Sequence, residues 1–139
     1  MHQPAADTEL DRDICKLAHR FIQHLDAHVR RAADDLDLTP TQVIALRELT
    51  EPITARELAH RMVCEPPNAT FVIDRLEKQG LIERRPHPTD RRAKQVVLTE
   101  TGHERRAEVL AHLAAHTPLA ALDTDQQDAL RALLQNLVA

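Results

Sequence analysis

The sequence is poor in aromatic residues, glycine and cysteine. Its 139 residues include two phenylalanines, no tryptophan and no tyrosine, so a buried core must consist mainly of Leu, Val, Ile and Ala. The two glycines, together with a single candidate strand pair, favour a mainly helical fold. Cys15 and Cys64 are too few for a disulfide framework, which excludes the small disulfide-stabilised secreted proteins.

Long apolar runs are also missing. No stretch of 18 consecutive apolar residues is present, and the first residues lack the features of a signal peptide. We therefore expect a soluble cytoplasmic protein without membrane contacts. The length of 139 residues is that of a single domain or slightly less.

The chain as a whole has no excess of positive charge, because its formal net charge is −4. The charge is unevenly distributed, however. Residues 54–106 contain 11 cations and 8 acids, a net charge of +3, whereas residues 1–53 carry −4 and residues 107–139 carry −3. Phosphate groups respond to local charge rather than to the total, so this distribution favours a nucleic-acid contact within residues 54–106.

The stretch from Thr54 to Gly80 has the pattern of two helices joined by a turn. Thr54 and Glu57 have the spacing of a capping box, in which each side chain accepts a hydrogen bond from the other residue's backbone N–H. Pro66 and Pro67 suit the start of a second helix, because proline lacks the N–H that would be unpaired there. Gly80 is expected to end this helix in the left-handed conformation.

The second of these helices has two different faces. Four apolar residues at helical spacing predict the buried face: Ala69, Val72, Ile73 and Leu76. The outer face carries Asn68, Phe71, Arg75 and Lys78, with Pro67 and Thr70 close by. An amide near a helix N-terminus can read a base edge, a phenyl ring can meet a thymine methyl group, and cations can reach phosphates. These residues predict a helix that binds in the DNA major groove; the alternative is an ordinary surface helix with one exposed Phe.

Two short runs with strand propensity follow, 81–85 and 94–98. The loop between them, PHPTDRRA, is too polar for a core, and residues 81–94 contain five cations against two acids. A ribbon with an arginine-rich tip beside a helix-turn-helix can reach the minor groove or the phosphates. We predict that Arg91 and Arg92 contact DNA from this tip.

The segment DRLEKQGLIERRPHPTDRRAKQVVLTETG resembles the signature of the multiple antibiotic resistance regulator (MarR) family of bacterial repressors. In that signature a winged helix-turn-helix is followed by D-x-R, here Asp90-Arg91-Arg92, and by L-T-x-x-G, here residues 98–102. The resemblance extends from about residue 10 to residue 137. It implies a homodimer that binds a pseudo-palindromic operator, and a pair of Asp90 with Arg92 that shapes the wing.

Long amphipathic helices are predicted at both ends of the chain. Apolar residues recur at intervals of three and four over residues 8–34, and a leucine-rich last helix begins near Asp123. A long helix with one apolar stripe needs a partner surface, and the family resemblance implies that the other subunit provides it. We therefore predict a dimerisation region of residues 1–38 and 103–139, and a winged helix-turn-helix DNA-binding region of residues 39–102.

Two further helices are predicted from their caps. Thr39 and Gln42 form a second capping box, and the helix that they start is expected to run to about Thr50. Thr99 is expected to cap a helix that lasts until about Thr117.

Members of the MarR family are usually switched by a small molecule, an oxidant or a metal. A small organic acid or phenol bound between the first, second and fifth predicted helices is one possibility, since cations there would meet its carboxylate. The candidates are Arg20, His24, Arg30, Arg31 and Arg47.

Cys15 resembles the sensing cysteine of the organic-hydroperoxide repressors of this family. Lys16 and His19 lie near it in sequence, and a nearby cation favours the reactive thiolate. Those repressors also surround the thiol with tyrosines, which this chain lacks, so a role as a small core residue is the alternative. Cys64, in the turn of the helix-turn-helix, is predicted to be buried.

Two histidine pairs have the i, i+4 spacing that lets one helix face chelate a metal. They are His24 with His28 and His112 with His116. No thiol or carboxylate is clearly grouped with them, so we predict no metal site and no cofactor.

The sequence thus predicts a mainly α, homodimeric DNA-binding transcriptional regulator, a repressor released from an inverted-repeat operator by a small-molecule effector. One alternative is a redox-sensing repressor that uses Cys15. Another is a winged helix used only for protein–protein contacts, against which the wing arginines argue. We expect no enzyme, because no nucleophile, base and orienting group occur at a recognisable spacing.

Overall fold

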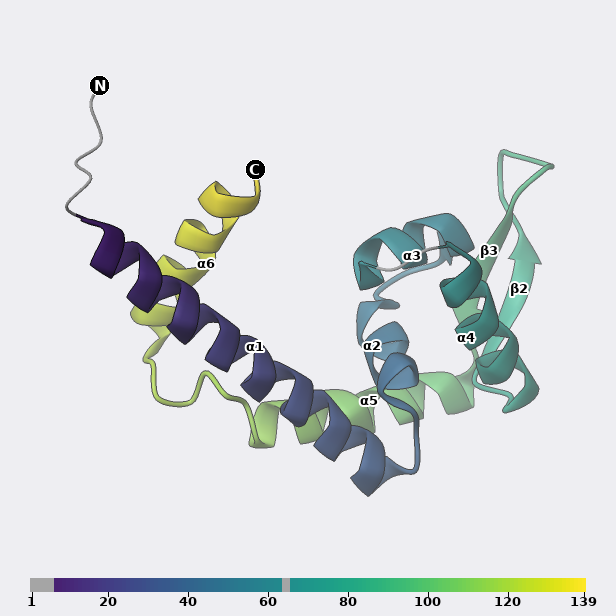
Figure 1. Cartoon of the computed structure of the whole chain (residues 1–139). Coiled ribbons are helices and arrows are strands. Elements are labelled where there is room, and N and C mark those ends of the chain that lie inside the picture. The colour runs from purple at the N-terminus through teal and green to yellow at the C-terminus, as the bar shows by residue number, and fades with distance from the viewer. Residues whose placement is uncertain (1–6, 64–65) are drawn as a thin grey trace. The chain divides into compact units, whose positions relative to one another are not determined.

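The computed structural model describes residues 7–63 and 66–139, which are mainly helical with one small sheet (Figure 1). In chain order the elements are α1 (Thr8–Leu36), α2 (Pro40–Glu48), β1 (Ile53–Thr54), α3 (Ala55–Met62), α4 (Pro66–Lys78), β2 (Ile82–Pro86), β3 (Lys94–Leu98), α5 (Glu100–Ala115) and α6 (Thr124–Val138). None of the described helices is both long and apolar enough to cross a membrane.

The chain divides into two compact units. The terminal unit combines Met1–His28 with His116–Ala139, and the central unit is Val29–Ala115. Helix α1 begins in the terminal unit and ends in the central unit.

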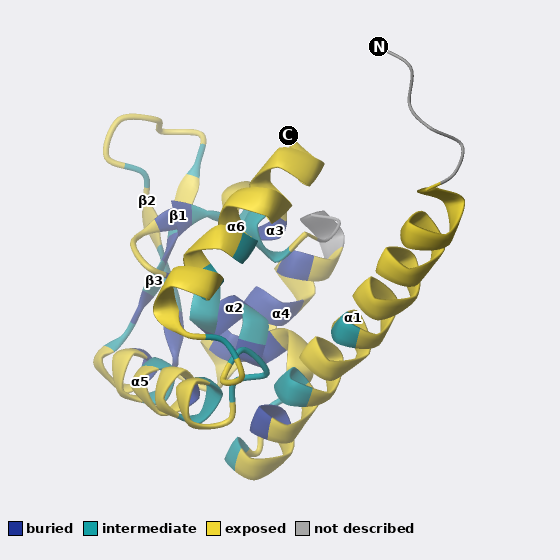
Figure 2. Cartoon of the chain, turned by 90° about the vertical axis from the view of Figure 1, so that its left-hand side faces the viewer, coloured by how far each residue is buried: buried dark blue, intermediate teal, exposed yellow. Residues whose placement is uncertain are grey.

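The hydrophobic core lies in the central unit, where the buried residues gather on α2, α4 and the sheet (Figure 2). Its largest fully buried apolar side chains are aliphatic: Leu46, Ile53, Leu58, Ile73, Leu76, Ile82, Val43, Val96 and Val109. The predicted inner face of α4 is buried throughout, with exposed fractions of 5% or less. The expectation of an aliphatic core is therefore confirmed for the described residues.

Helix α2 begins with the predicted capping box. The Thr39 hydroxyl accepts from the Gln42 N–H at 3.2 Å, and the Gln42 side chain accepts from the Thr39 N–H at 2.9 Å. The Gln42 side chain is only 2% exposed, and its amide nitrogen donates to the Gln79 side-chain oxygen at 3.0 Å. A buried polar group requires a hydrogen-bond partner, and the Gln79 side chain is the partner of Gln42. The bond therefore links the start of α2 to the residue that follows α4.

The sheet is antiparallel, with three strands in the order β1-β3-β2. Strands β2 and β3 form the predicted ribbon, with Ile82 opposite Leu98 at its base. The third strand, in which Ile53 pairs with Val96, adds to the predicted two-stranded wing. A strand of two residues directly after Pro52 is too short to show a periodic pattern in the sequence.

The end of α4 and the start of α5 are joined through Thr99 and Gly102. Gly80 has a φ of +74°, and the Leu81 N–H donates to the Leu76 carbonyl at 3.0 Å, which confirms the predicted left-handed end. The Thr99 hydroxyl donates to the Gly80 carbonyl at 2.6 Å and accepts from the Gly102 N–H at 3.0 Å. A Cβ atom at Gly102 would overlap the Leu81 carbonyl group, so only glycine fits this close approach.

Arginine side chains from α5 bind the C-terminal ends of α1 and α2. Arg105 donates to the carbonyl of Leu36, the last residue of α1. Arg106 donates to the Leu46 carbonyl at 2.9 Å and to the Arg47 carbonyl at 3.1 Å. The last carbonyls of a helix have no intrahelical partner, and a cation complements the helix dipole there. The two arginines therefore connect α5 to both helices.

The terminal unit leaves a large apolar surface exposed. No residue of α6 is buried, and Leu133 and Leu137 are 61% and 79% exposed. On α1, Leu10, Ile14 and Leu17 are each more than half exposed. An apolar groove of about 480 Å³ is lined in part by Phe21, Leu25, Leu119, Leu130, Leu134 and Val138.

The observed boundaries differ slightly from the predicted ones. Helices α1, α2 and α5 end two residues from their predicted ends, and β2 is shifted by one residue; terminal residues are the least strongly determined part of an element. The capping box predicted at α3 is half formed. The Thr54 hydroxyl accepts from the Glu57 N–H at 3.1 Å, whereas no reciprocal bond to the Glu57 side chain occurs among the described residues.

Helix α3 ends at a strained residue. Val63 has a φ of +56° and ψ of +49°, the left-handed conformation, which crowds the Cβ atom of an L-residue and is rare for a β-branched one. Its side chain is 91% exposed, so little packing compensates for the strain.

Replacing Val63 with glycine should therefore stabilise the fold. Relief of the left-handed strain, less the entropy that glycine loses on folding, leaves a gain of about 0.5–1 kcal/mol. Urea unfolding would measure this gain. Val63→Ala retains a Cβ atom and serves as the control with the smaller effect. A decrease in stability for Val63→Gly would contradict the strain assignment.

Candidate nucleic-acid interface

The outer face of α4 is exposed as the sequence pattern indicates. Asn68, Thr70, Phe71, Arg75 and Lys78 are all exposed, and Phe71 retains 64% of its accessible surface. The Arg75 guanidinium carbon lies 6.0 Å from the centre of the Phe71 ring, at the limit of a cation–π contact. The side chain of Pro67 lies outside the described residues. Apart from Pro67, the side chains predicted to contact DNA from this helix therefore reach solvent together.

Hollows border Phe71 on both sides. One, of about 420 Å³, is lined by Phe71, Arg75, Lys78 and Gln79. The other, of about 260 Å³, is lined by Asn68 and Phe71 with apolar side chains of α2, α3 and α4. The exposed ring thus lines both hollows on the outer side of α4.

In the wing tip, two side chains accept hydrogen bonds from main-chain N–H groups. The Asp90 carboxylate accepts from the Arg92 N–H at 2.9 Å. Within the described residues no ion pair joins the Asp90 carboxylate to the Arg92 guanidinium, so the pair that the family resemblance implies acts through the backbone. His87 Nδ1 accepts from the N–H groups of Thr89 at 3.2 Å and Asp90 at 3.1 Å. The side chains of Arg91 and Arg92 are left exposed.

The structure divides the cations of residues 54–106 into two groups. One group binds carboxylates or main-chain carbonyls: Arg61, Arg84, Arg85, Arg105 and Arg106. In the described part of the chain no carboxylate partner is found for the other group, which consists of Arg56 on α3 together with Arg75, Lys78, Arg91, Arg92 and Lys94. The charge available to an anionic partner is therefore concentrated on the outer face of α4 and at the wing.

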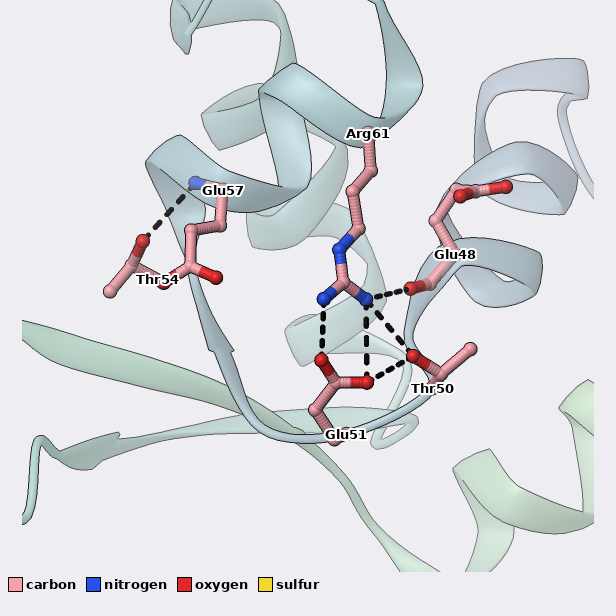
Figure 3. A network of polar contacts seen from close by, with 6 residues as sticks. All are labelled: Glu48, Thr50, Glu51, Thr54, Glu57 and Arg61. Carbon is pink, nitrogen blue, oxygen red and sulfur yellow. Dashed lines mark hydrogen bonds and ion pairs between the residues drawn. The ribbon is translucent and has the colours of Figure 1, made fainter. Parts of the chain in front are cut away.

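A network around Arg61 fixes α3 against the end of α2 (Figure 3). Its guanidinium donates to the Glu48 carbonyl at 3.1 Å, to the Thr50 hydroxyl at 3.0 Å and to the Glu51 carboxylate. The hydrogen bonds from Arg61, and secondarily from Thr50, hold the pKa of Glu51 below its ordinary value. The same contact with Glu51 raises the pKa of Arg61. This network sets the position of the first helix of the helix-turn-helix.

The predicted effector cations are divided between the two compact units, with Arg20 and His24 in the terminal unit and Arg30, Arg31 and Arg47 in the central unit. Arg20 and His24 line a hollow of about 290 Å³ together with Leu17, Phe21 and Pro118. Arg31 lies 3.9 Å from the Asp35 carboxylate, and Arg47 donates to the Glu48 carboxylate at 2.8 Å. Arg20 and His24 therefore remain the best-placed pair for a carboxylate.

Cys15 is exposed on α1, and His19 Nδ1 donates to its carbonyl oxygen at 2.8 Å rather than to the sulfur. Its predicted redox role thus rests on accessibility alone. Cys64 lies outside the described residues.

One histidine of the two pairs has a carboxylate beside it. His112 Nε2 lies 2.7 Å from an Asp35 carboxylate oxygen. Across residues 7–63 and 66–139, no group of three or more His, Cys, Asp or Glu side chains is placed to hold a metal ion.

Comparison with known proteins agrees with this geometry. A model of the MarR family matches residues 38–94. The HTH-type transcriptional repressor MdtR of Bacillus subtilis (strain 168) is 30% identical over 105 residues, which cover 74% of this chain and 68% of MdtR. The chain belongs to the MarR family. The transcriptional repressor MprA of Escherichia coli (strain K12) is 39% identical over 89 residues, 63% of this chain, and the match spans about half (51%) of MprA. Both relatives are named as transcriptional regulators, which are not a class of enzymes.

The MarR fold extends over the whole chain. The transcriptional repressor CouR, solved bound to a 23-mer DNA duplex, superposes with a TM-score of 0.76 at 23% identity, covering 100% of each chain. The prediction of a mainly α winged helix-turn-helix with long terminal helices is thereby confirmed.

Part of the MarR signature is explained by contacts within the fold. Its threonine and last glycine, Thr99 and Gly102, join α4 to α5. The contacts of His87, Arg61 and Arg84 were not predicted from the sequence. In the sequence, His87 is marked only by the prolines on either side of it and by the nearby D-x-R motif. The hydrogen-bond partners of Arg61 and Arg84 lie 7 to 13 residues away in sequence, so no local pattern predicts these bonds.

The Arg61 network should make stability depend on pH. Because the pKa of Glu51 is lowered in the folded chain, the network contributes stability above its ordinary value of 4.5, and this contribution is lost as the pH falls through the folded-state pKa. Glu51→Gln should therefore be less stable than the wild type at neutral pH, and the difference should vanish at low pH. Chemical denaturation at several pH values checks this, with the exposed Glu104→Gln as the control. A Glu51→Gln curve parallel to that of the wild type would refute the assignment.

Proposed function

We propose that this MarR-family chain is a transcriptional repressor that binds an inverted-repeat DNA operator as a homodimer and is released by a small-molecule effector. The observation that carries the proposal is the sorting of the cations. Of the cations of residues 54–106 without a carboxylate partner among the described residues, all but Arg56 on α3 lie on the outer face of α4 and at the wing, beside exposed Asn68 and Phe71. The names of MdtR and MprA as repressors, and the DNA bound to CouR, support it.

The two elements have different roles in this proposal. Helix α4 is the recognition helix, with Asn68 at its N-terminal end facing base edges and Phe71 facing thymine methyl groups. Arg75 and Lys78 lie one and two turns further along, where they meet phosphates. Arg91 and Arg92 bind the minor groove or its phosphates, where shape and A·T content carry most of the information.

A second copy of the chain is the proposed partner for the terminal unit. Soluble monomers rarely expose contiguous apolar surfaces as large as those of α1 and α6. In a homodimer with two-fold symmetry, the same surface of the second subunit covers them. We keep residues 1–38 and 103–139 as the dimerisation region and residues 39–102 as the DNA-binding region, although the compact units divide at other positions.

For the effector we propose a small organic acid or phenol. Arg20 and His24 supply donors for a carboxylate, and Leu17, Phe21 and Pro118 supply apolar contacts in the same hollow of about 290 Å³. The alternative trigger is oxidation of the exposed Cys15.

Selection from a pool of random duplexes should recover an inverted repeat. Two recognition helices related by a two-fold axis meet successive major grooves about 10 base pairs apart. Sequencing of the bound fraction measures the half-site spacing, and sedimentation of the complex measures two chains per duplex. A single half-site occupied by one chain would contradict the proposal. Binding that does not fall with rising salt would instead favour a protein-interaction module, because phosphate contacts release counterions.

Substitutions should separate the recognition helix from the wing. Asn68→Ala should cost about 1–3 kcal/mol on the selected duplex and much less on random DNA. Replacing both Arg91 and Arg92 with alanine should weaken binding to both duplexes and reduce the salt slope by about one to two units. Titrations of both duplexes at several salt concentrations make the comparison. If Asn68→Ala weakens binding to both duplexes equally, and the arginine double variant loses binding only to the selected duplex, the roles assigned to the recognition helix and the wing are reversed.

A further inference from the structure

Arg84 joins the wing to the recognition helix. Its Nη1 atom lies 2.5 Å from a Glu77 carboxylate oxygen, and its Nη2 atom lies 2.6 Å from an Asp74 carboxylate oxygen. The Arg84 side chain is 25% exposed, whereas those of Asp74 and Glu77 are 54% and 41% exposed. One guanidinium group on β2 thus holds two carboxylates one helical turn apart on α4.

The strand pattern explains how Arg84 reaches α4. Alternate residues of a strand share a face, so Arg84 points to the same side of the sheet as Ile82. Ile82 is 2% exposed and belongs to the core with Ile73 and Leu76 of α4. Two residues further along the same face, Pro86 is exposed. Arg84 therefore lies where the wing leaves the core, between the buried base of the ribbon and its free tip.

The energy of such a contact does not explain its presence. Partly exposed ion pairs contribute little to folding stability, although a guanidinium shared by two carboxylates fixes orientation better than a single pair does. The contact also occupies a cation that would otherwise suit DNA, and it offsets one of the two negative charges that Asp74 and Glu77 place next to Arg75 and Lys78. The Arg84 contact thus has two separate consequences: it positions the wing, and it offsets negative charge on α4.

We propose that Arg84 is a positioning residue that sets the wing against the recognition helix, so that the tip arginines and α4 reach one duplex together. The proposal rests on the proposed DNA-binding function. Arg84 itself contacts no phosphate and acts through Arg91 and Arg92. Its effect should therefore depend on the presence of those two side chains.

A double-mutant cycle tests this dependence. Arg84→Gln should weaken binding to the selected duplex by about three- to tenfold when the tip is intact, and by less than twofold when Arg91 and Arg92 are already alanine. Equal losses in the two backgrounds would overturn the proposal, because a general effect on folding or on net charge is additive. Arg85→Gln is the matched control, since Arg85 pairs with Glu83 on its own strand and its loss should be the same in both backgrounds.

Removing the partner acids gives a test of opposite sign. The double variant Asp74→Ala, Glu77→Ala loses two negative charges, so electrostatics alone would make it bind DNA more tightly. Loss of wing position should instead weaken binding about three- to tenfold. Tighter binding by this variant would refute the positioning role.

Hydrogen exchange in the free protein tests the contact without DNA. The amides of residues 84–95 should exchange faster in Arg84→Gln than in Arg85→Gln, while the amides of α2 are unchanged. Unchanged exchange in Arg84→Gln would overturn the inference even if the chain binds DNA. Conversely, a wild-type chain that binds no duplex would refute the proposed function, and the exchange measurement would still decide whether Arg84 orders the wing.

Discussion

The central unit depends on arginine side chains that bind the main-chain carbonyls at helix C-termini. Arg105 binds the end of α1, while Arg61 and Arg106 bind the end of α2 from α3 and α5. With only two glycines in the chain, glycine-based helix ends are scarce, and the guanidinium groups satisfy carbonyls that would otherwise lack partners. Each bond also connects two helices. The position of α2, and through it of the helix-turn-helix, follows from these contacts.

The same contacts determine which positive charges face outward. Arginines that bind carbonyls or carboxylates are occupied, so the 11 cations of residues 54–106 overstate the number available to DNA. Apart from Arg56 on α3, the remaining cations of residues 54–106 lie on one face of α4 and at the wing, and Arg84 links those two elements. Arginine is thus used in two ways in the central unit: it connects helices inside the unit, and at the exposed surface it is a candidate ligand for phosphate.

Local patterns in the sequence predicted those parts of the structure that depend on neighbouring residues. The capping box of Thr39 and Gln42, the left-handed Gly80 and the two faces of α4 all result from spacings within one helix. The roles of Arg61 and Arg84 could not be predicted, because their partners are brought close by packing. The strand formed by Ile53 and Thr54 is stabilised by β3 rather than by its own propensity. The proposed DNA contacts came from the helical spacing of α4 and from the cationic loop between β2 and β3, and the family resemblance added the pairing of Asp90 with Arg92.

The most direct test of the account is hydrogen exchange of the chain with and without its selected duplex. The account predicts slower exchange in the N-terminal half of α4 and in residues 87–93 on addition of DNA, with α6 little changed. Both protected segments should regain fast exchange together as salt is raised. Protection confined to α1 and α6, with α4 and the wing unaffected, would contradict the claim that this surface binds DNA.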